Sequence, residues 1–164
     1  MAVRAIVRLG NPLLWTASLR VSDPVCEETR QVLRDLDDTL AGFRAASGWG
    51  RGISAVQIGE LQRISFVRLV SGEKFDFINP EIVERSRETF ELWDDCFSFP
   101  GLLVRVKRNH KVAVRYQDHK GLRRELEAEG DLSELLQHEF DHLDGILAID
   151  RRIDDRSFKM SGGE

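Results

Sequence analysis

The sequence predicts an α+β fold, in which antiparallel strands pack around a central metal-binding helix and a second helix lies near the N-terminus. Apolar residues recur at helical spacing between Pro24 and Gly48. Short segments with alternating apolar residues occupy the middle of the chain, and a histidine-containing segment with helical spacing follows them at 131–145. Helices on either side of a run of strands are typical of the α+β class.

The length and composition fit one folded domain spanning residues 1–164, since the chain is long enough to bury a sizeable core. A net charge of −4 argues against direct binding of nucleic acid. No apolar run approaches the roughly 20 residues that span a bilayer, so we expect no membrane association. Two cysteines do not suggest a disulfide framework, which favours a reducing compartment, the cytoplasm. The oligomeric state stays open.

The first helix is expected to begin at Ser22-Asp23-Pro24, because proline suits a first helical turn, and to end at Gly48. Cys26, in that first turn, is expected to fill the core. Strands are expected at residues 63–70, 75–78, 103–106, 111–116 and 122–128, separated by turn-forming residues.

The second helix contains the pentad His-Glu-Phe-Asp-His at 138–142. Positions i and i+4 share a helix face, so His138 and His142 can reach one metal ion, and Glu139 can take a proton from an attacking water. Asp131 is the expected N-cap, with Glu134 completing a capping box, and Gly145 is the expected stop. The pattern indicates metal-assisted hydrolysis, although two histidines also occur on ordinary amphipathic helices.

An open catalytic metal site usually has three protein ligands, of which the pentad supplies two. The residues alone leave the third open between a cysteine, a histidine and a carboxylate. For Cys96, a ligand role and a role as a small buried residue are equally compatible with the sequence. A sulfur with two imidazoles suits iron(II), zinc, cobalt or nickel, so ligand type does not identify the metal. The candidates are Cys26, Cys96, His110, His119 and Asp144.

Three segments, taken in order, resemble the three motifs of the peptide deformylases. Residues 50–59, G-R-G-I-S-A-V-Q-I-G, resemble the pattern G-x-G-x-A-A-P-Q-x-G, and residues 94–98, D-D-C-F-S, resemble E-G-C-L-S. Residues 137–145, Q-H-E-F-D-H-L-D-G, match Q-H-E-x-D-H-L-x-G in full. Residues 6–14 also resemble the family's first strand and turn, so the similarity spans roughly the whole chain.

The resemblance implies that Cys96, His138 and His142 bind one divalent metal ion, with Fe2+ expected natively and Zn2+, Ni2+ or Co2+ as alternatives. It implies Glu139 as general base and acid. It also implies two donors to the developing oxyanion, the side chain of Gln57 and the backbone N–H of Phe97.

The implied reaction removes formate from the N-formylmethionine of nascent polypeptides, with the peptide lying along a strand edge. N-formylated nascent peptides, which could be ribosome-associated, are therefore the expected partners. The expected substrate-binding residues are Gly50, Gly52, Ile53, Asp94, Asp95 and Arg108.

The second motif departs from the family pattern at two positions. Asp94 replaces glutamate and is expected to contact Arg108 across a shorter reach. Asp95 replaces a glycine that could be needed for positive φ or for room beside the substrate.

Further departures lie elsewhere. Ser54 and Val56 replace alanine and proline of the first motif. Glu134 stands where relatives have an arginine or an apolar residue lining the methionine pocket, and we expect it to point outward.

Two alternative functions follow from these departures. One is an amidase for another N-acyl group, and the other is a degenerate relative that binds N-terminal peptides without turnover. The intact Glu139 argues against the second.

Overall fold

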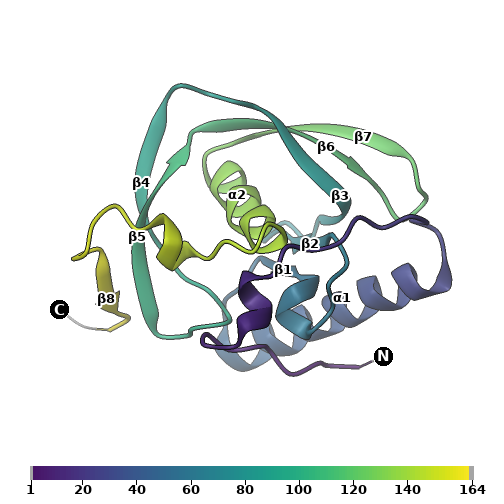
Figure 1. Cartoon of the computed structure of the whole chain (residues 1–164), viewed down its shortest axis with the longest axis horizontal. Helices are drawn as coiled ribbons and strands as arrows, with labels where there is room; N and C mark the ends of the chain where they lie inside the picture. The colour runs from purple at the N-terminus through teal and green to yellow at the C-terminus, as the bar shows by residue number, and fades with distance from the viewer. Residues whose placement is uncertain (1, 163–164) are drawn as a thin grey trace.

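The structure, a computed structural model, describes residues 2–162 and contains two α-helices and eight β-strands (Figure 1). The helices are α1 (Glu27–Ser47) and α2 (Asp131–Leu143). The strands are β1 (Gly52–Ser54), β2 (Ile64–Arg68), β3 (Lys74–Arg85), β4 (Thr89–Asp94), β5 (Leu102–Asn109), β6 (Lys111–Gln117), β7 (Arg123–Glu129) and β8 (Phe158–Met160). Short 3-10 helices cover Pro12–Trp15, Ala55–Ile58 and Ala148–Arg151.

The strands form two antiparallel sheets. The larger sheet has the order β1-β2-β3-β6-β7, and the smaller has the order β4-β5-β8. The strand β1 therefore lies at an edge of the larger sheet, paired with β2 alone. The predicted α+β fold is confirmed.

The helix α2 lies at the centre of the molecule, enclosed by the strands, while α1 runs along one side (Figure 1). One apolar cluster joins the inner face of α2 to the larger sheet, with Leu136, Phe140 and Phe77 at its centre. A second cluster packs α1 against β1 and β2. Because α2 is covered on most sides, the polar side chains that it carries are held in a water-poor interior.

The helix α1 ends as the sequence predicts, with Gly48 as its C-cap at φ 80°, a left-handed conformation that suits glycine. It begins later than predicted, at Glu27. Cys26 is not core filler but the N-cap, whose sulfur lies 3.5 Å from the Thr29 backbone nitrogen. A capping side chain must face the helix end, which keeps this cysteine half-exposed.

The predicted strands are present, but β3 is longer than expected, and β1, β4 and β8 were not predicted. The strand β3 continues through Asn79-Pro80, where the pairing with β6 shifts register and Asn79 has φ 52°. This irregularity admits a proline that otherwise indicates the end of a strand. Residues 6–10 form no strand; their chain is tied by the Val7 and Leu9 N–H groups to carbonyls of residues 57 and 98.

Within residues 2–162, no helix has the length and apolar character needed to cross a bilayer.

Candidate active site

The helix α2 places three polar side chains of the pentad in the interior. His138, Glu139 and His142 are at most 7% exposed. The predicted capping box is wrong, because the N-cap is Gly130, at φ 58°. Asp131 is already the first helical residue, and the Glu134 carboxylate binds Arg51 instead of the helix end. The helix ends at Leu143, just before Gly145, as predicted.

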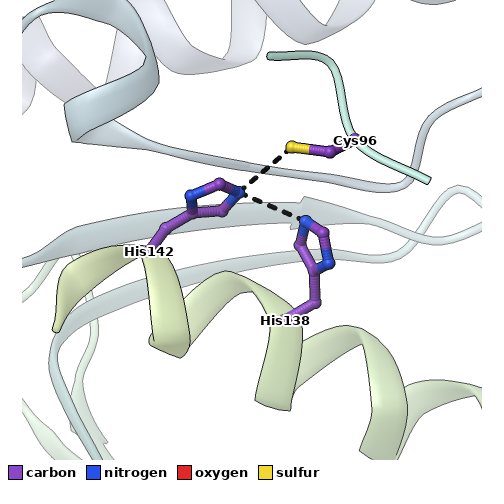
Figure 2. Close-up of side chains that lie close together, drawn as sticks. All are labelled: Cys96, His138 and His142. Carbon is purple, nitrogen blue, oxygen red and sulfur yellow. Dashed lines mark hydrogen bonds between the residues drawn. The ribbon is translucent and has the colours of Figure 1, made fainter. Parts of the chain in front are cut away.

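Cys96 approaches the two histidines from the segment that follows β4 (Figure 2). Its Sγ lies 3.3 Å from His142 Nε2, which in turn lies 3.2 Å from His138 Nε2. All three ligand atoms lie within 4.8 Å of one another and are buried.

The other candidate ligands are elsewhere. His119 pairs with Asp76, His110 lies near Glu129, Asp144 binds Arg63, and Cys26 caps α1.

The three converging atoms fit a divalent metal ion. A thiolate and two imidazoles form a ligand set that iron(II), zinc, cobalt and nickel all accept, and three protein ligands leave a position for water or substrate. Burial lowers the pKa of His142 well below its ordinary value, which keeps that imidazole neutral. A neutral imidazole has a free nitrogen lone pair, as a metal ligand requires.

A buried ionic network orients His138. Its Nδ1 lies 2.9 Å from Asp94, which also accepts a hydrogen bond of 3.1 Å from Arg108. The predicted contact between Asp94 and Arg108 is confirmed despite the shorter side chain, and it is buried. Arg108 also binds Asp141, which Arg151 holds from the other side. Such partners fix the tautomer and ring orientation of a metal-binding histidine.

The charges in this network shift the pKa of both partners. Burial alone would raise the pKa of Asp94, but His138 and Arg108 lower it to about 2. Burial alone would lower the pKa of His138, but the Asp94 carboxylate raises it well above its ordinary value. Asp94 is therefore an anion at neutral pH and holds the proton of His138 on Nδ1.

Glu139 lies in a tight, buried pocket beside the metal-ligand residues and is 3% exposed. Its Oε2 accepts a hydrogen bond of 2.7 Å from Ser54, and a Cβ at Gly52 would come within 2.5 Å of its Oε1. Burial raises the pKa of Glu139 to about 7, although His138 and the Ser54 hydrogen bond oppose the rise. A carboxyl with this pKa can take up and release a proton near neutral pH.

Gln57 and Phe97 lie on the Cys96 side. The Gln57 side-chain nitrogen is 3.6 Å from Cys96 Sγ and 3.3 Å from Ser98 Oγ, while its oxygen accepts from the Ser54 N–H. These contacts orient the amide with its N–H groups toward the sulfur. The Phe97 carbonyl accepts from Arg8, which anchors the loop that carries Cys96.

One cleft of about 410 Å³ is lined by Gln57, Cys96, Phe97, His138 and Glu139, whereas His142 is buried and does not line it. Gly50, Gly52, Asp94 and Asp95 line it, whereas Ile53 is fully buried in the core. Asp95 does not have positive φ, because Asn79 is the only non-glycine residue in that region within residues 2–162. The aspartate therefore causes no backbone strain there.

Arg108 is buried beneath the site and does not line the cleft.

The far end of the cleft differs from expectation. Glu134 does not point outward; its side chain is 8% exposed, lines the cleft and forms an ion pair with Arg51. The expectation failed because the carboxylate has a cationic partner across the cleft, on the segment before β1.

Two residues at the site were not predicted from sequence, Ser54 as the partner of Glu139 and Arg51 as the partner of Glu134. Both lie inside the first motif, but only the folded chain brings them to α2. Because no sequence signal pairs these positions, reading the motif could not assign either role.

Comparisons with known proteins agree with this geometry. A family model described as polypeptide deformylase matches residues 3–158. The peptide deformylase of Thermomicrobium roseum is 41% identical over 165 residues, covering 96% of this chain and 89% of that protein. The crystal structure of the Thermotoga maritima peptide deformylase superposes with a TM-score of 0.86 at 32% identity, covering 94% of this chain and all of that one.

A class I type b peptide deformylase from Acinetobacter baumannii, solved with Met-Ala-Ser bound, has a TM-score of 0.82 at 26% identity, covering 92% of this chain and 98% of the other. The chain belongs to the peptide deformylase family and is a metal-dependent amidohydrolase of that kind.

Proposed function

We propose that this protein hydrolyses the formyl amide at the N-terminus of peptides, releasing formate and a free amino terminus. One observation carries the proposal: the Cys96, His138 and His142 ligand atoms lie together, and Cys96, His138, the Glu139 carboxyl and the Gln57 amide line one cleft. No member of this group alone indicates a hydrolase, but together they supply a metal site, a base and an oxyanion donor.

The edge strand β1 offers a seat for the peptide. It pairs only with β2 and lies beside the cleft, so an extended peptide can add to it through main-chain hydrogen bonds. Gly50 and Gly52 leave room for the Phe97 ring and the Glu139 carboxyl, which a Cβ at these positions would meet, and Ile53 would contribute its backbone to the peptide. The Met-Ala-Ser found in the Acinetobacter baumannii relative supports a short peptide as product.

Cys96, His138 and His142 would hold the metal ion, which when bound supplies a Lewis acid that makes water more acidic and polarises a carbonyl. Glu139 accepts a proton from the attacking water as the new bond to the formyl carbon forms. The Gln57 N–H and the Phe97 backbone N–H donate to the developing oxyanion. Glu139 then gives its proton to the amine as the C–N bond breaks, which leaves formate and the free amino terminus.

Asp94 and Arg108 belong to the ionic network beside His138. We propose that they hold His138 rather than touch the peptide, since both are about 95% buried and Arg108 does not line the cleft. Asp95, at the cleft wall, is free to contact substrate.

We further propose nascent chains bearing N-formylmethionine as the substrate, iron(II) as the native ion and the cytoplasm as the compartment. The family supports the substrate, and the sulfur-containing ligand set accepts iron(II). Association with the ribosome remains a prediction; co-sedimentation with ribosomes in a salt series tests it.

A formate-release assay on formyl-Met-Ala tests the activity. The protein should be loaded without oxygen with iron(II), or loaded with nickel(II). Wild-type protein should turn over, and Glu139→Ala should lose roughly 100- to 10,000-fold in kcat, because general acid–base catalysis typically contributes that much. Glu129→Ala, which removes a half-exposed carboxylate of β7, is the matched control and should retain full activity.

Full activity of Glu139→Ala would refute the assigned base. Binding of formyl peptides without formate release would indicate a peptide-binding relative. Cleavage of acetyl but not formyl peptides would indicate a different N-acyl amidase.

A further inference from the structure

The charged pair Glu134–Arg51 lies within reach of the first side chain of the substrate. Glu134 precedes His138 by four residues, which places it one turn away on the same face of α2, about 6 Å along the helix axis. Both residues line the same cleft as Cys96 and His138. The pair is therefore within reach of the first side chain of a peptide whose formyl carbon lies at the ligand atoms.

The two members of the pair differ in burial. The Glu134 side chain is 8% exposed, whereas Arg51 is 36% exposed and also donates to the Asp131 carbonyl at 3.4 Å. A carboxylate has about four lone-pair positions, of which the ion pair occupies only part. Within residues 2–162, Arg51 is the one side chain that donates a hydrogen bond to the Glu134 carboxylate, and burial raises the pKa of Glu134 although Arg51 opposes the rise.

Leu92, Trp93 and Leu135 also line this cleft, but an apolar side chain seated against the charged pair itself would displace water from the ion pair without forming hydrogen bonds to it. Such desolvation is unfavourable unless new hydrogen bonds compensate it. A carboxamide matches both partners, because its N–H can donate to Glu134 and its oxygen can accept from Arg51. Glutamine has nearly the length of methionine, so polarity rather than size distinguishes them in this cleft.

We propose that Glu134 and Arg51 determine specificity, so that the enzyme deformylates peptides whose first residue bears a carboxamide, such as glutamine, at least as well as formylmethionine peptides. This inference rests on the proposed deformylase activity and names the substrate class that the same site takes. The Glu134–Arg51 pair has no net charge, so it favours an uncharged polar side chain over aspartate or glutamate. An acidic side chain would also lie near the Asp95 carboxylate, which lines the cleft.

The test compares kcat/KM for formyl-Gln-Ala-Ser, formyl-Met-Ala-Ser and formyl-Glu-Ala-Ser with the nickel-loaded enzyme. In the wild type, the glutamine peptide should match or exceed the methionine peptide, and the glutamate peptide should be poorest. In Glu134→Leu, the ratio of glutamine to methionine should fall by about 10- to 100-fold, mainly through KM, because a lost hydrogen bond to a charged group changes discrimination by this order. Glu125→Leu breaks an exposed Glu–Arg pair on β7 and should leave the ratio unchanged.

Binding provides a second readout. The products Gln-Ala-Ser and Met-Ala-Ser should be titrated calorimetrically into wild type and Glu134→Leu, with the same reversal of preference expected in Kd. A wild type that prefers methionine by more than tenfold, with a ratio that Glu134→Leu does not change, overturns the inference while leaving deformylase activity intact. Absence of formate release from every peptide refutes the proposed function itself.

Discussion

The two ends of the cleft differ in how closely they follow the family pattern. At the C-terminal part of α2, Cys96, His138, Glu139 and His142 form a buried arrangement in which every group has the neighbours that metal-assisted hydrolysis requires. One turn earlier, Glu134 forms an ion pair with Arg51, where the resemblance to the family implied an arginine or an apolar side chain. The metal-binding end therefore matches the expectation from the family, whereas the Glu134 end departs from it.

The largest effect is expected at the reaction end, from Cys96→Ser. Loss of the sulfur removes one of three ligands, and since even the partners behind metal ligands are worth about 10- to 100-fold in affinity, the loss should exceed 100-fold. Nickel affinity measured by competition with a chelator checks this. Cys26→Ser is the control; it should bind nickel as the wild type does, and equal loss in both variants would contradict the assignment of Cys96.

Gln57→Leu is expected to act on rate rather than on metal binding. Removing one oxyanion donor typically costs about 100- to 1000-fold in kcat, and nickel affinity should be unchanged. Gln31→Leu, at an exposed position of α1, should leave kcat unaltered. A Gln57→Leu enzyme with normal kcat would mean that another group stabilises the oxyanion.

The smallest effect concerns the network behind His138, and it depends on pH. In metal-free protein, the pKa of Asp94 is lowered from 3.8 to about 2. A lowered carboxyl pKa stabilises the fold above the unfolded-state value, and this contribution is lost as the pH falls through the folded-state value. Asp94→Asn should therefore reduce the unfolding free energy by on the order of 2 kcal/mol at pH 7, with the difference shrinking between about pH 4 and pH 2.

Urea unfolding of chelator-treated protein across this pH range measures the difference. Asp155→Asn, at a side chain that is 95% exposed, should show no such dependence. A constant difference between wild type and Asp94→Asn at every pH would argue that packing, rather than charge, explains the role of Asp94.

The sequence predicted the metal-ligand residues correctly and the orientation of Glu134 incorrectly, and each outcome has a physical reason. His138 and His142 are four residues apart on one helix, so local geometry alone places them together. Cys96, Gln57 and Glu139 come from separate elements, so no local rule predicts that they are close in space. Only the resemblance to a known family predicted that they share one site. The partnership of Glu134 with Arg51 spans 83 residues and follows no local rule, so the short-range capping box was chosen instead.

The same distinction applies to the fold. The helix α1 ends where glycine can adopt positive φ, a property visible in the sequence. The continuation of β3 past Pro80 depends on a bulge opposite β6, which only strand pairing can reveal. The sequence therefore predicted both helices and most of the strands, while the extents of the elements and the strands β1, β4 and β8 became evident only from the folded chain.

The most direct test of the account is formate release from formyl-Met-Ala measured while nickel is added stepwise to metal-free protein. Activity should rise linearly and reach a plateau at one nickel ion per chain. Activity that is absent at every loading, or that is undiminished in the metal-free protein, would contradict the account.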